Sequence, residues 1–332
     1  MEKKRHHYVP ITYLNGFTDN LGRIFGYRKD APNPPLHVRP DEIGFEKYYY
    51  SQPTPDGGQD NNRLEDLFST VEGIWPGIVA DLSAGRQVGS RIEELFQFIS
   101  LLRIRGPAAR DPIELYLAHH ARRTMLQLAA EGKIGPLPGG LTFDDIEISI
   151  DPHQSLHGMI AMMGGFARLL GYFGIEVMHN TTAEPFATSD NPVVVFDPDV
   201  PEAGILPYTV RSPIGRVEML LPISSKTMLR GRSGIAPHRA GDTLRHVEMS
   251  AGAEVRRVNR FVARFGYRFV FASHAGLGKL VEKHAALSPT VRFDEVDAGV
   301  HGQYEFMQMV FGPRPQKPKW TRDRKRPING EG

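Results

Sequence analysis

The chain has 332 residues, of which 40% are hydrophobic and 23% are charged, a composition typical of soluble globular proteins. Cysteine is absent, which excludes disulfides, thiol nucleophiles and cysteine-ligated zinc. No stretch approaches the roughly 20 apolar residues of a membrane-spanning helix, and no apolar run follows the basic start, so we expect a cytoplasmic protein without membrane contact. The formal net charge of +2 gives no general argument for nucleic-acid binding.

Two adjacent histidines, His6 and His7, precede Pro10, which can begin a short helix ending at Gly16. Free N–H groups at a helix start favour an anion, and an imidazole beside them can bind or protonate it. Neighbouring residues of an extended segment point to opposite sides, so at most one imidazole is expected at such a site. The alternative is that one histidine binds backbone while the other faces solvent. We recognise no zinc signature and predict neither metal nor cofactor.

After this motif, residues 22–27 alternate like a short strand, and proline-rich loops follow through Pro40. Apolar positions at helical spacing then predict a helix over residues 64–84. Pro76 should split or kink that helix, because proline removes a backbone donor and clashes with the preceding turn.

Three further helices follow along the chain. The first opens with a capping box of Ser90 and Glu93. The second has Asp111 as its N-cap and Pro112 as its first helical residue. The third runs over about residues 155–171, although its glycines weaken the prediction.

The second half changes to short apolar runs bounded by turn residues, which is typical of strands. Strands are predicted at residues 193–196, 219–222, 228–230, 267–272 and 304–311. Between them, a regular apolar stripe predicts a helix that starts after Asp242 and reaches Phe265, and a short helix begins near Leu277. Helices followed by strands with interleaved helices predict an α+β fold.

We therefore predict one α+β domain over residues 1–312, with a mainly helical part at about 60–175 and a sheet-containing part at about 176–312. The opening motif should dock beside the sheet, because its apolar side chains need to be buried. A single small mixed sheet with interleaved helices is expected to be built from the segments of Val193, Leu220 and Phe269.

Residues 313–332 form a basic tail, in which Asp323 is the only acid between Arg314 and Arg326. Prolines and like charges cannot build a core, so the tail is expected to be disordered. It is either an arm for nucleic acid or another phosphate-bearing partner, with Trp320 available for stacking, or a solvated terminus.

Several short segments form a recognisable series along the chain. They are His6-His7-Tyr8-Val9-Pro10 with Tyr13, Leu14 and Phe17, then residues 46–51, Thr188-Ser189-Asp190-Asn191-Pro192-Val193, Pro222-Ile223-Ser224, and Val258-Asn259. Their order and spacing over most of residues 5–275 resemble the bacterial family called domain of unknown function 4238. This resemblance implies a shared fold and a shared polar site, and it implies no particular activity.

Asp190 and Asn191 stand directly before Pro192 and a predicted strand. Proline forces the preceding residue into an extended conformation, which fixes the directions of both side chains. Asp190 is then a general base or the residue that orients a histidine. The alternative is an Asx-turn that closes the loop on itself. The family resemblance favours the functional interpretation.

Arg103 lies on the apolar stripe of its predicted helix, and a guanidinium facing a core requires a carboxylate, carbonyl groups or a bound anion. Glu72, at the buried edge of an earlier helix, is a possible partner in a structural ion pair. Asn259 also faces inward, where backbone or a ligand must satisfy its amide.

Two functions fit these residues. In the first, the protein is a hydrolase or nuclease-like enzyme that acts on a phosphate-bearing substrate in one cleft. Its catalytic residues are His7, Asp190 and His6, and its substrate-binding residues are Arg103, Asn191, Asn259 and Glu72. In the second, the same residues form a structural polar network, and the protein is a binding or regulatory module for a nucleotide, a peptide or nucleic acid. The histidine motif and the basic tail are the expected contacts for such a partner.

Overall fold

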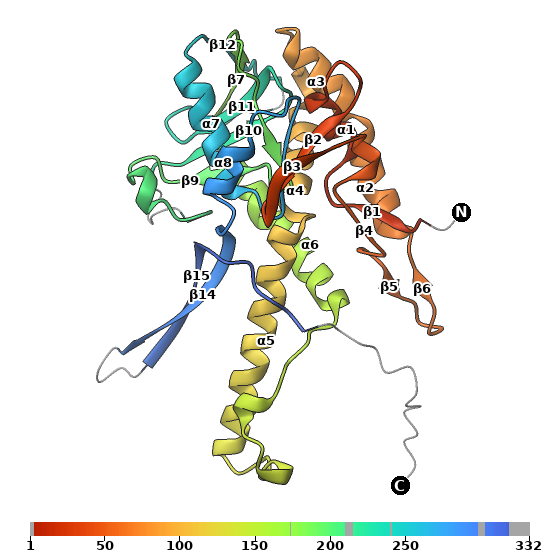
Figure 1. Ribbon diagram of the computed structural model, residues 1–332, viewed down its shortest axis with the longest axis vertical. Helices are drawn as coiled ribbons and strands as arrows, with labels where there is room; N and C mark the ends of the chain where they lie inside the picture. Colours follow the sequence, from red (N-terminus) through yellow and green to blue (C-terminus); the bar gives the residue numbers. More distant parts are fainter. Residues whose placement is uncertain (1–2, 173, 210–214, 240, 298–302, 319–332) are drawn as a thin grey trace.

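Figure 1 shows the chain as a computed structural model, which describes residues 3–172, 174–209, 215–239, 241–297 and 303–318. The fold is α+β, as the sequence predicts. Helices dominate the segment between Arg63 and Leu170, and the strands lie before and after it in several small sheets. Within the described ranges, no helix has both the length and the hydropathy needed to cross a bilayer.

The opening histidine motif is folded against the rest of the molecule. β1 (Arg5–His7) pairs antiparallel with β4 (Phe45–Lys47). The buried Tyr13 hydroxyl donates to the carbonyl oxygen of Pro222 (2.7 Å) and lies 2.6 Å from the Thr188 hydroxyl. These bonds join the first residues of the chain to segments about 200 residues later. The prediction that the motif docks beside a sheet is confirmed.

The helical part contains a split that the sequence predicts. The helices are α1 (Ile11–Leu14), α2 (Arg63–Gly73), α3 (Trp75–Ser83), α4 (Ile92–Ile104), α5 (Pro107–Ala130), α6 (Pro152–Leu170), α7 (Gly252–Phe265) and α8 (Gly278–Lys283). Pro76 lies in the first turn of α3 and separates it from α2. The capping box of Ser90 and Glu93 is absent at the start of α4, because a short 3-10 turn precedes it and Arg91 takes the N-cap position.

The start of α5 also differs from the prediction. Pro107 rather than Pro112 opens the helix, and its missing N–H costs nothing in the first turn. Asp111 is therefore inside the helix and is not an N-cap. Its carboxylate instead accepts from the Tyr267 hydroxyl (2.6 Å) and from the Lys317 ammonium (2.5 Å), so tertiary contacts explain why an acid is buried there.

Two sheets stand where a single one was predicted. A five-stranded sheet has the order β12-β7-β11-β10-β9, with only β12 and β7 parallel, and an antiparallel four-stranded sheet has the order β3-β2-β13-β8. Their strands are β2 (Ile24–Arg28), β3 (Ala31–Val38), β7 (Gly174–Asn180), β8 (Thr188–Ser189), β9 (Val194–Phe196), β10 (Glu218–Pro222), β11 (Thr227–Arg232), β12 (Arg245–Met249) and β13 (Phe269–Ala272). Leu220 belongs to the first sheet and Phe269 to the second, so the prediction of one shared sheet is wrong.

Two segments have a structure that their local sequence does not indicate. The proline-rich segment predicted as loop forms β3, which lies at a sheet edge where Pro34 and Pro35 need no outward hydrogen bond. The helix predicted from Asp242 starts only at Gly252, because residues 245–249 pair in parallel with β7. Strand pairing outweighs apolar spacing there.

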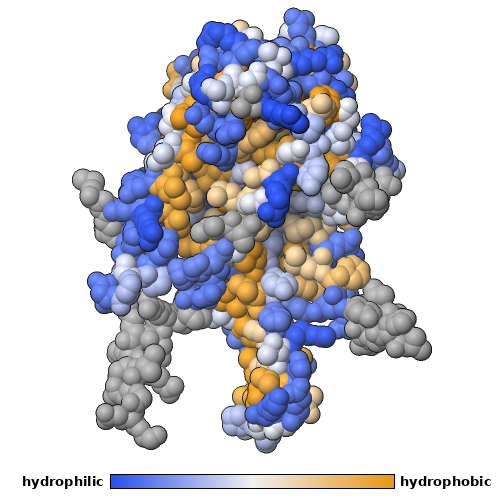
Figure 2. Space-filling view, turned by 180° about the vertical axis from the view of Figure 1, so that it is seen from behind, coloured by the Kyte–Doolittle hydropathy of each residue, from blue (hydrophilic) through white to orange (hydrophobic). Residues whose placement is uncertain are grey.

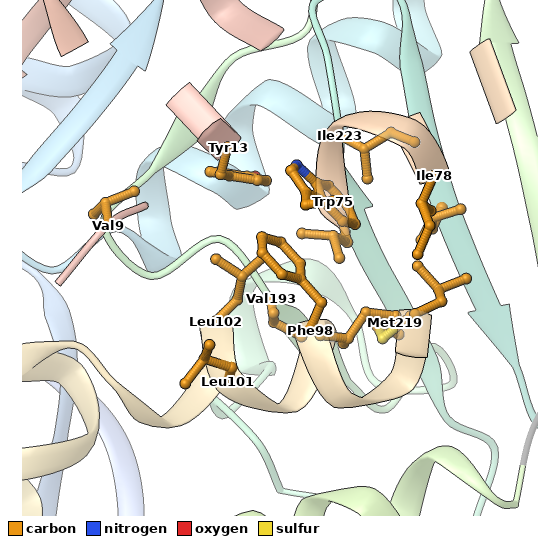
Figure 3. Packing of buried hydrophobic residues seen from close by; sticks show 14 of the residues in the cluster. Val9, Tyr13, Trp75, Ile78, Phe98, Leu101, Leu102, Val193, Met219 and Ile223 are labelled. Atoms are coloured by element: carbon orange, nitrogen blue, oxygen red, sulfur yellow. The ribbon is translucent and has the colours of Figure 1, made fainter. Parts of the chain in front are cut away.

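An aromatic core joins the helices to the five-stranded sheet. Trp75 of α3 stacks on Phe98 of α4 with 3.9 Å between ring centroids, and Tyr13 stands 6.1 Å from the same indole. Figure 3 shows these rings beside Met219 and Ile223, which come from the sheet and its following turn. Burial of such large apolar surfaces is the main contribution to the stability of the fold.

A long helix and a hairpin extend from the body of the molecule (Figure 1), and the projecting end of the helix is also visible from behind at the bottom of Figure 2. The strands of the two remaining pairs are β5 (Gln52–Pro53) with β6 (Gln59–Asp60) and β14 (Ser288–Asp297) with β15 (Gln303–Gly312). His119 of α5 stacks on Phe293 of β14 at 3.9 Å, and Arg123 pairs with Glu295 at 3.0 Å. This hairpin therefore packs against α5. The predicted strand at 304–311 is confirmed.

The start of the basic tail is also attached to the body. Lys317 binds the carboxylates of Asp111 and Glu114, and Arg314 donates to the carbonyl oxygen of Tyr267 at 3.0 Å. The expectation that the tail does not pack is therefore wrong for Arg314 and Lys317. Trp320 and the basic residues after it lie outside the described residues, so their predicted stacking stays a prediction.

Two truncations should separate these parts of the tail. Ending the chain after Gly312 is expected to lower the free energy of unfolding by about 1–3 kcal/mol, because it leaves the buried Asp111 without its cation. Ending it after Pro318 should leave that free energy unchanged. Urea unfolding of both forms measures the difference, and equal stabilities would show that the Lys317 contacts contribute nothing.

Candidate functional site

His6 binds backbone groups through both of its ring nitrogens. Its side chain is fully buried, its Nδ1 accepts from the Tyr50 N–H (2.8 Å), and its Nε2 donates to the carbonyl oxygen of Lys3 (3.0 Å). Both ring nitrogens are therefore occupied, which fixes a neutral tautomer. Burial lowers the pKa of His6 and favours the same neutral form.

His7 lies on the opposite side of β1, as expected for neighbouring residues of a strand. It is partly buried beside Phe45, and its Nε2 lies 3.3 Å from the carbonyl oxygen of Asp41. Burial also lowers the pKa of His7, so it is largely neutral at pH 7. Among the contacts of the described residues, none joins His7 to Asp190.

Asp190 closes the turn between α7 and β13. Its Oδ1 accepts from the N–H of Tyr267 (2.7 Å) and its Oδ2 accepts from the N–H of Arg268 (2.8 Å). Its own N–H donates to the carbonyl oxygen of Phe269 at 3.2 Å. Burial raises the pKa of Asp190, while these hydrogen bonds oppose the rise. The carboxylate thus serves two backbone donors, neither of them a histidine.

The two asparagines are also bound to backbone. Asn191 donates from Nδ2 to the carbonyl oxygen of Phe265 (2.8 Å). Asn259 accepts from the Ala187 N–H (2.8 Å) through Oδ1 and donates to the carbonyl oxygen of Pro185 (3.0 Å). The prediction that Asn259 faces inward is confirmed by its burial, and backbone supplies the partners that its amide needs.

Glu72 pairs with an arginine that the sequence analysis missed. Its carboxylate accepts from Arg105, which also donates to the carbonyl oxygen of His7 and is almost completely buried. The predicted pair with Arg103 is therefore wrong. The Arg103 guanidinium lies 3.6 Å from the centre of the Tyr208 ring, and its buried Nη1 has no hydrogen-bond partner among the described atoms. Both arginines follow apolar residues of α4, and that spacing could have revealed Arg105 as well.

The predicted site residues lie in or beside the motif segments, and most of their polar atoms form hydrogen bonds within the protein. Three motif segments meet where Tyr13 binds Thr188 and Pro222. A fourth is held where Asn259 binds the backbone that leads into Thr188. This arrangement favours the structural alternative for His6, Asp190, Asn191 and Asn259.

An open pocket of about 350 Å³ lies elsewhere, at the end of the five-stranded sheet. Its lining includes Pro198, Arg216, Val217, Glu218, Arg230, Arg232, Ser233, Gly234, Ile235 and Arg257, and we call it the arginine pocket. Arg230 and Arg232 are on one face of β11, because residues two apart in a strand point the same way. Arg257 comes from α7, which packs on this face through Val255 and Val258.

The pocket carries more positive than negative charge. Arg230 (2.9 Å), Arg232 (2.7 Å) and Arg245 (3.3 Å) all approach the buried carboxylate of Glu176, so one negative charge is shared by three positive ones. The Nε of Arg232 is buried without a hydrogen bond among the described atoms. Arg257 lies 5.0 Å above the Phe261 ring. No spacing in the sequence indicates this cluster, because strand register assembles it.

A family model described as "Protein of unknown function (DUF4238)" matches residues 5–276. No curated protein and no solved structure matches the chain significantly. The matched range holds the histidine motif, the Asp190 segment, Asn259 and the arginine pocket, whereas the hairpin of β14 and β15 lies beyond it. Because the match covers most of the chain, this protein is a member of the DUF4238 family.

Proposed function

We propose that the protein is a binding module for a small phosphate-bearing ligand, which it holds in the arginine pocket. The observation that carries the proposal is the excess of guanidinium groups around Glu176, at a pocket with room for a ligand. Guanidinium groups are complementary to phosphate oxygens in charge and geometry, and they form paired hydrogen bonds with them. The buried Nε of Arg232 has no acceptor among the described atoms and provides a donor for a ligand.

The size and walls of the pocket favour an organic phosphate over inorganic phosphate. Its volume of about 350 Å³ falls within the range of about 300–1,000 Å³ typical of small-molecule sites. Pro198, Val217 and Ile235 add apolar wall, and the Glu218 carboxylate can accept from a hydroxyl or amino group. A nucleoside monophosphate or a sugar phosphate has this combination of parts.

Binding is favoured over hydrolysis by the chemistry of the lining. No histidine is among the described lining residues, and the Ser233 hydroxyl oxygen accepts from the Val217 N–H (3.0 Å). The acid-base residues expected from the sequence, His7 and Asp190, belong to other elements and are bound as described above. A hydrolase or nuclease would need a base within hydrogen-bond reach of the phosphate, and Glu218 is the carboxylate of the described lining that could act as one. The titration below therefore also follows the release of phosphate.

Calorimetric titration with a nucleoside monophosphate, a sugar phosphate, inorganic phosphate and a single-stranded oligonucleotide tests the proposal. We expect an organic phosphate to bind most tightly, and Arg257→Gln to weaken its binding at least tenfold, as loss of a charge-assisted hydrogen bond predicts. Arg256→Gln is the matched control, since Arg256 neighbours Arg257 on α7 but pairs with Glu184 outside the pocket.

The proposal fails if none of the organic phosphates binds, or if both arginine variants weaken binding equally. Preferred binding of the oligonucleotide, with an affinity that falls steeply between about 50 and 200 mM salt, would point to nucleic acid instead. Release of phosphate during the titration, lost in His7→Ala, would restore the hydrolase interpretation.

A further inference from the structure

Two histidines face each other at the start of α6. His153 and His157 are four residues apart, which places them on one side of the helix. Their Nε2 atoms are 3.0 Å apart, and their rings are nearly perpendicular, at 78°. His157 is exposed to solvent and His153 partly so, and therefore a solute can reach the space beside both nitrogens.

The distance between the two nitrogens suits a shared metal ion. Bonds of about 2.0–2.1 Å from a metal to two imidazoles place the nitrogens about 2.9 Å apart at a 90° angle, and about 3.4 Å apart at a tetrahedral angle. The observed 3.0 Å matches two neighbouring positions of a square-planar or octahedral ion. Cu²⁺ and Ni²⁺ prefer these geometries, whereas Zn²⁺ in proteins is usually tetrahedral.

We propose that His153 and His157 form a two-histidine chelating site for Cu²⁺ or Ni²⁺, with water in the remaining positions. In the free protein, one Nε2 carries a proton and donates to the other. On binding, that proton moves to Nδ1 of its own ring through solvent, and both Nε2 lone pairs point to the metal. Two histidines four residues apart on a helix are a known metal-ligand pattern, so the spacing of His153 and His157 is a sequence signal for this site.

The surroundings set how tightly such a site can bind. No third metal ligand completes a group with these histidines, since no set of three or more His, Asp or Glu in the described residues is arranged around a metal position. The Nδ1 of His153 is buried and has no partner in the described part of the chain, and the bound state requires a proton on it. We therefore expect affinity well below that of a closed four-ligand site, with Cu²⁺ ahead of Ni²⁺ and Zn²⁺, as the general affinity order also predicts.

The site is tested with the full chain, free of any polyhistidine tag. Calorimetric titration with Cu²⁺, Ni²⁺ and Zn²⁺ in a non-chelating buffer should show one Cu²⁺ site per chain. Electron paramagnetic resonance of the Cu²⁺ form should show two imidazole nitrogens. His157→Gln should weaken Cu²⁺ binding at least tenfold and remove one of the two nitrogens, and because His157 is exposed, the variant should keep the melting temperature of the parent chain.

A second histidine pair provides the control. His179 and His246 are also close, at 2.8 Å on neighbouring strands, but both rings are partly buried, whereas His157 is exposed. We therefore expect the metal to bind at α6 and His246→Gln to leave Cu²⁺ binding unchanged. If His246→Gln abolishes the signal while His157→Gln retains it, the α6 site is excluded. Absence of stoichiometric Cu²⁺ binding, or tighter binding of Zn²⁺ than of Ni²⁺, would also contradict the proposal.

Discussion

Replacing Asp190 with alanine is expected to lower the free energy of unfolding by about 3 kcal/mol or more. The substitution leaves the N–H groups of Tyr267 and Arg268 buried without their acceptors, and each unsatisfied group costs about 1–3 kcal/mol. Asp190→Asn should cost less, because the amide oxygen can still accept from one of the two donors. Urea unfolding monitored by circular dichroism measures both losses.

The same variants decide between the two roles that the sequence allows for Asp190. A structural carboxylate predicts that the properly folded fraction of Asp190→Asn binds ligand in the arginine pocket as the parent chain does. If Asp190→Asn kept full stability but lost turnover of a phosphate ester, Asp190 would be a catalytic base after all.

Replacing Arg105 with methionine is expected to lower the free energy of unfolding by about 3–5 kcal/mol at pH 8. Arg105 is 1% exposed and binds Glu72 and the carbonyl oxygen of His7, so its loss leaves a partly buried carboxylate and a backbone carbonyl without their donor. The Glu65 carboxylate, 3.9 Å away, also loses its nearest positive charge. Chemical unfolding at several pH values measures the effect.

The loss in Arg105→Met should shrink as the pH falls. Burial raises the pKa of Glu65 to about 7, and the attraction of Arg105 opposes that rise. Without Arg105 the pKa rises further, so the folded state of the variant is penalised most where Glu65 must be ionised, and least at pH 5, where it is protonated. A loss that grew toward acid pH would contradict this role for the ion pair.

Arg103→Met provides a matched comparison on the same helix. The Arg103 guanidinium lies over Tyr208, an interaction worth about 0.5–2 kcal/mol, and it has no carboxylate partner among the described residues. Methionine keeps much of the buried apolar volume at either position. We therefore expect Arg103→Met to be clearly less destabilising than Arg105→Met.

The sequence predicts which polar side chains are buried better than it predicts what they bind. The inward positions of Arg103 and Asn259 follow from helical spacing, and both are confirmed. Their partners depend on which elements meet in three dimensions, and for this reason the sequence suggests Arg103 as the partner of Glu72, whereas the structure pairs Glu72 with Arg105. Asp190 was placed correctly in a turn before a strand, but the donors that its carboxylate serves come from a segment about 77 residues later.

The same distinction applies to the secondary structure. Helices with a regular apolar stripe, such as α4 and α7, are found close to where the sequence predicts them. The sequence predicts no strand at β7 and a helix over β12. Pairing of these two strands with each other favours the extended conformation, and the local pattern does not contain that preference. The arginine pocket has the same origin, since cross-strand register sets Arg230 opposite Glu176.

The pairing of β2 with β13 has a consequence for how the chain folds during synthesis. The Tyr27 hydroxyl donates to the carbonyl oxygen of His274 across 247 residues of sequence, and β13 is an inner strand of the sheet that holds β2 and β3. Contacts this distant slow folding even where they stabilise the product. The β2–β3 hairpin leaves the ribosome with an unpaired edge, and that edge stays open to wrong partners until β13 has also emerged.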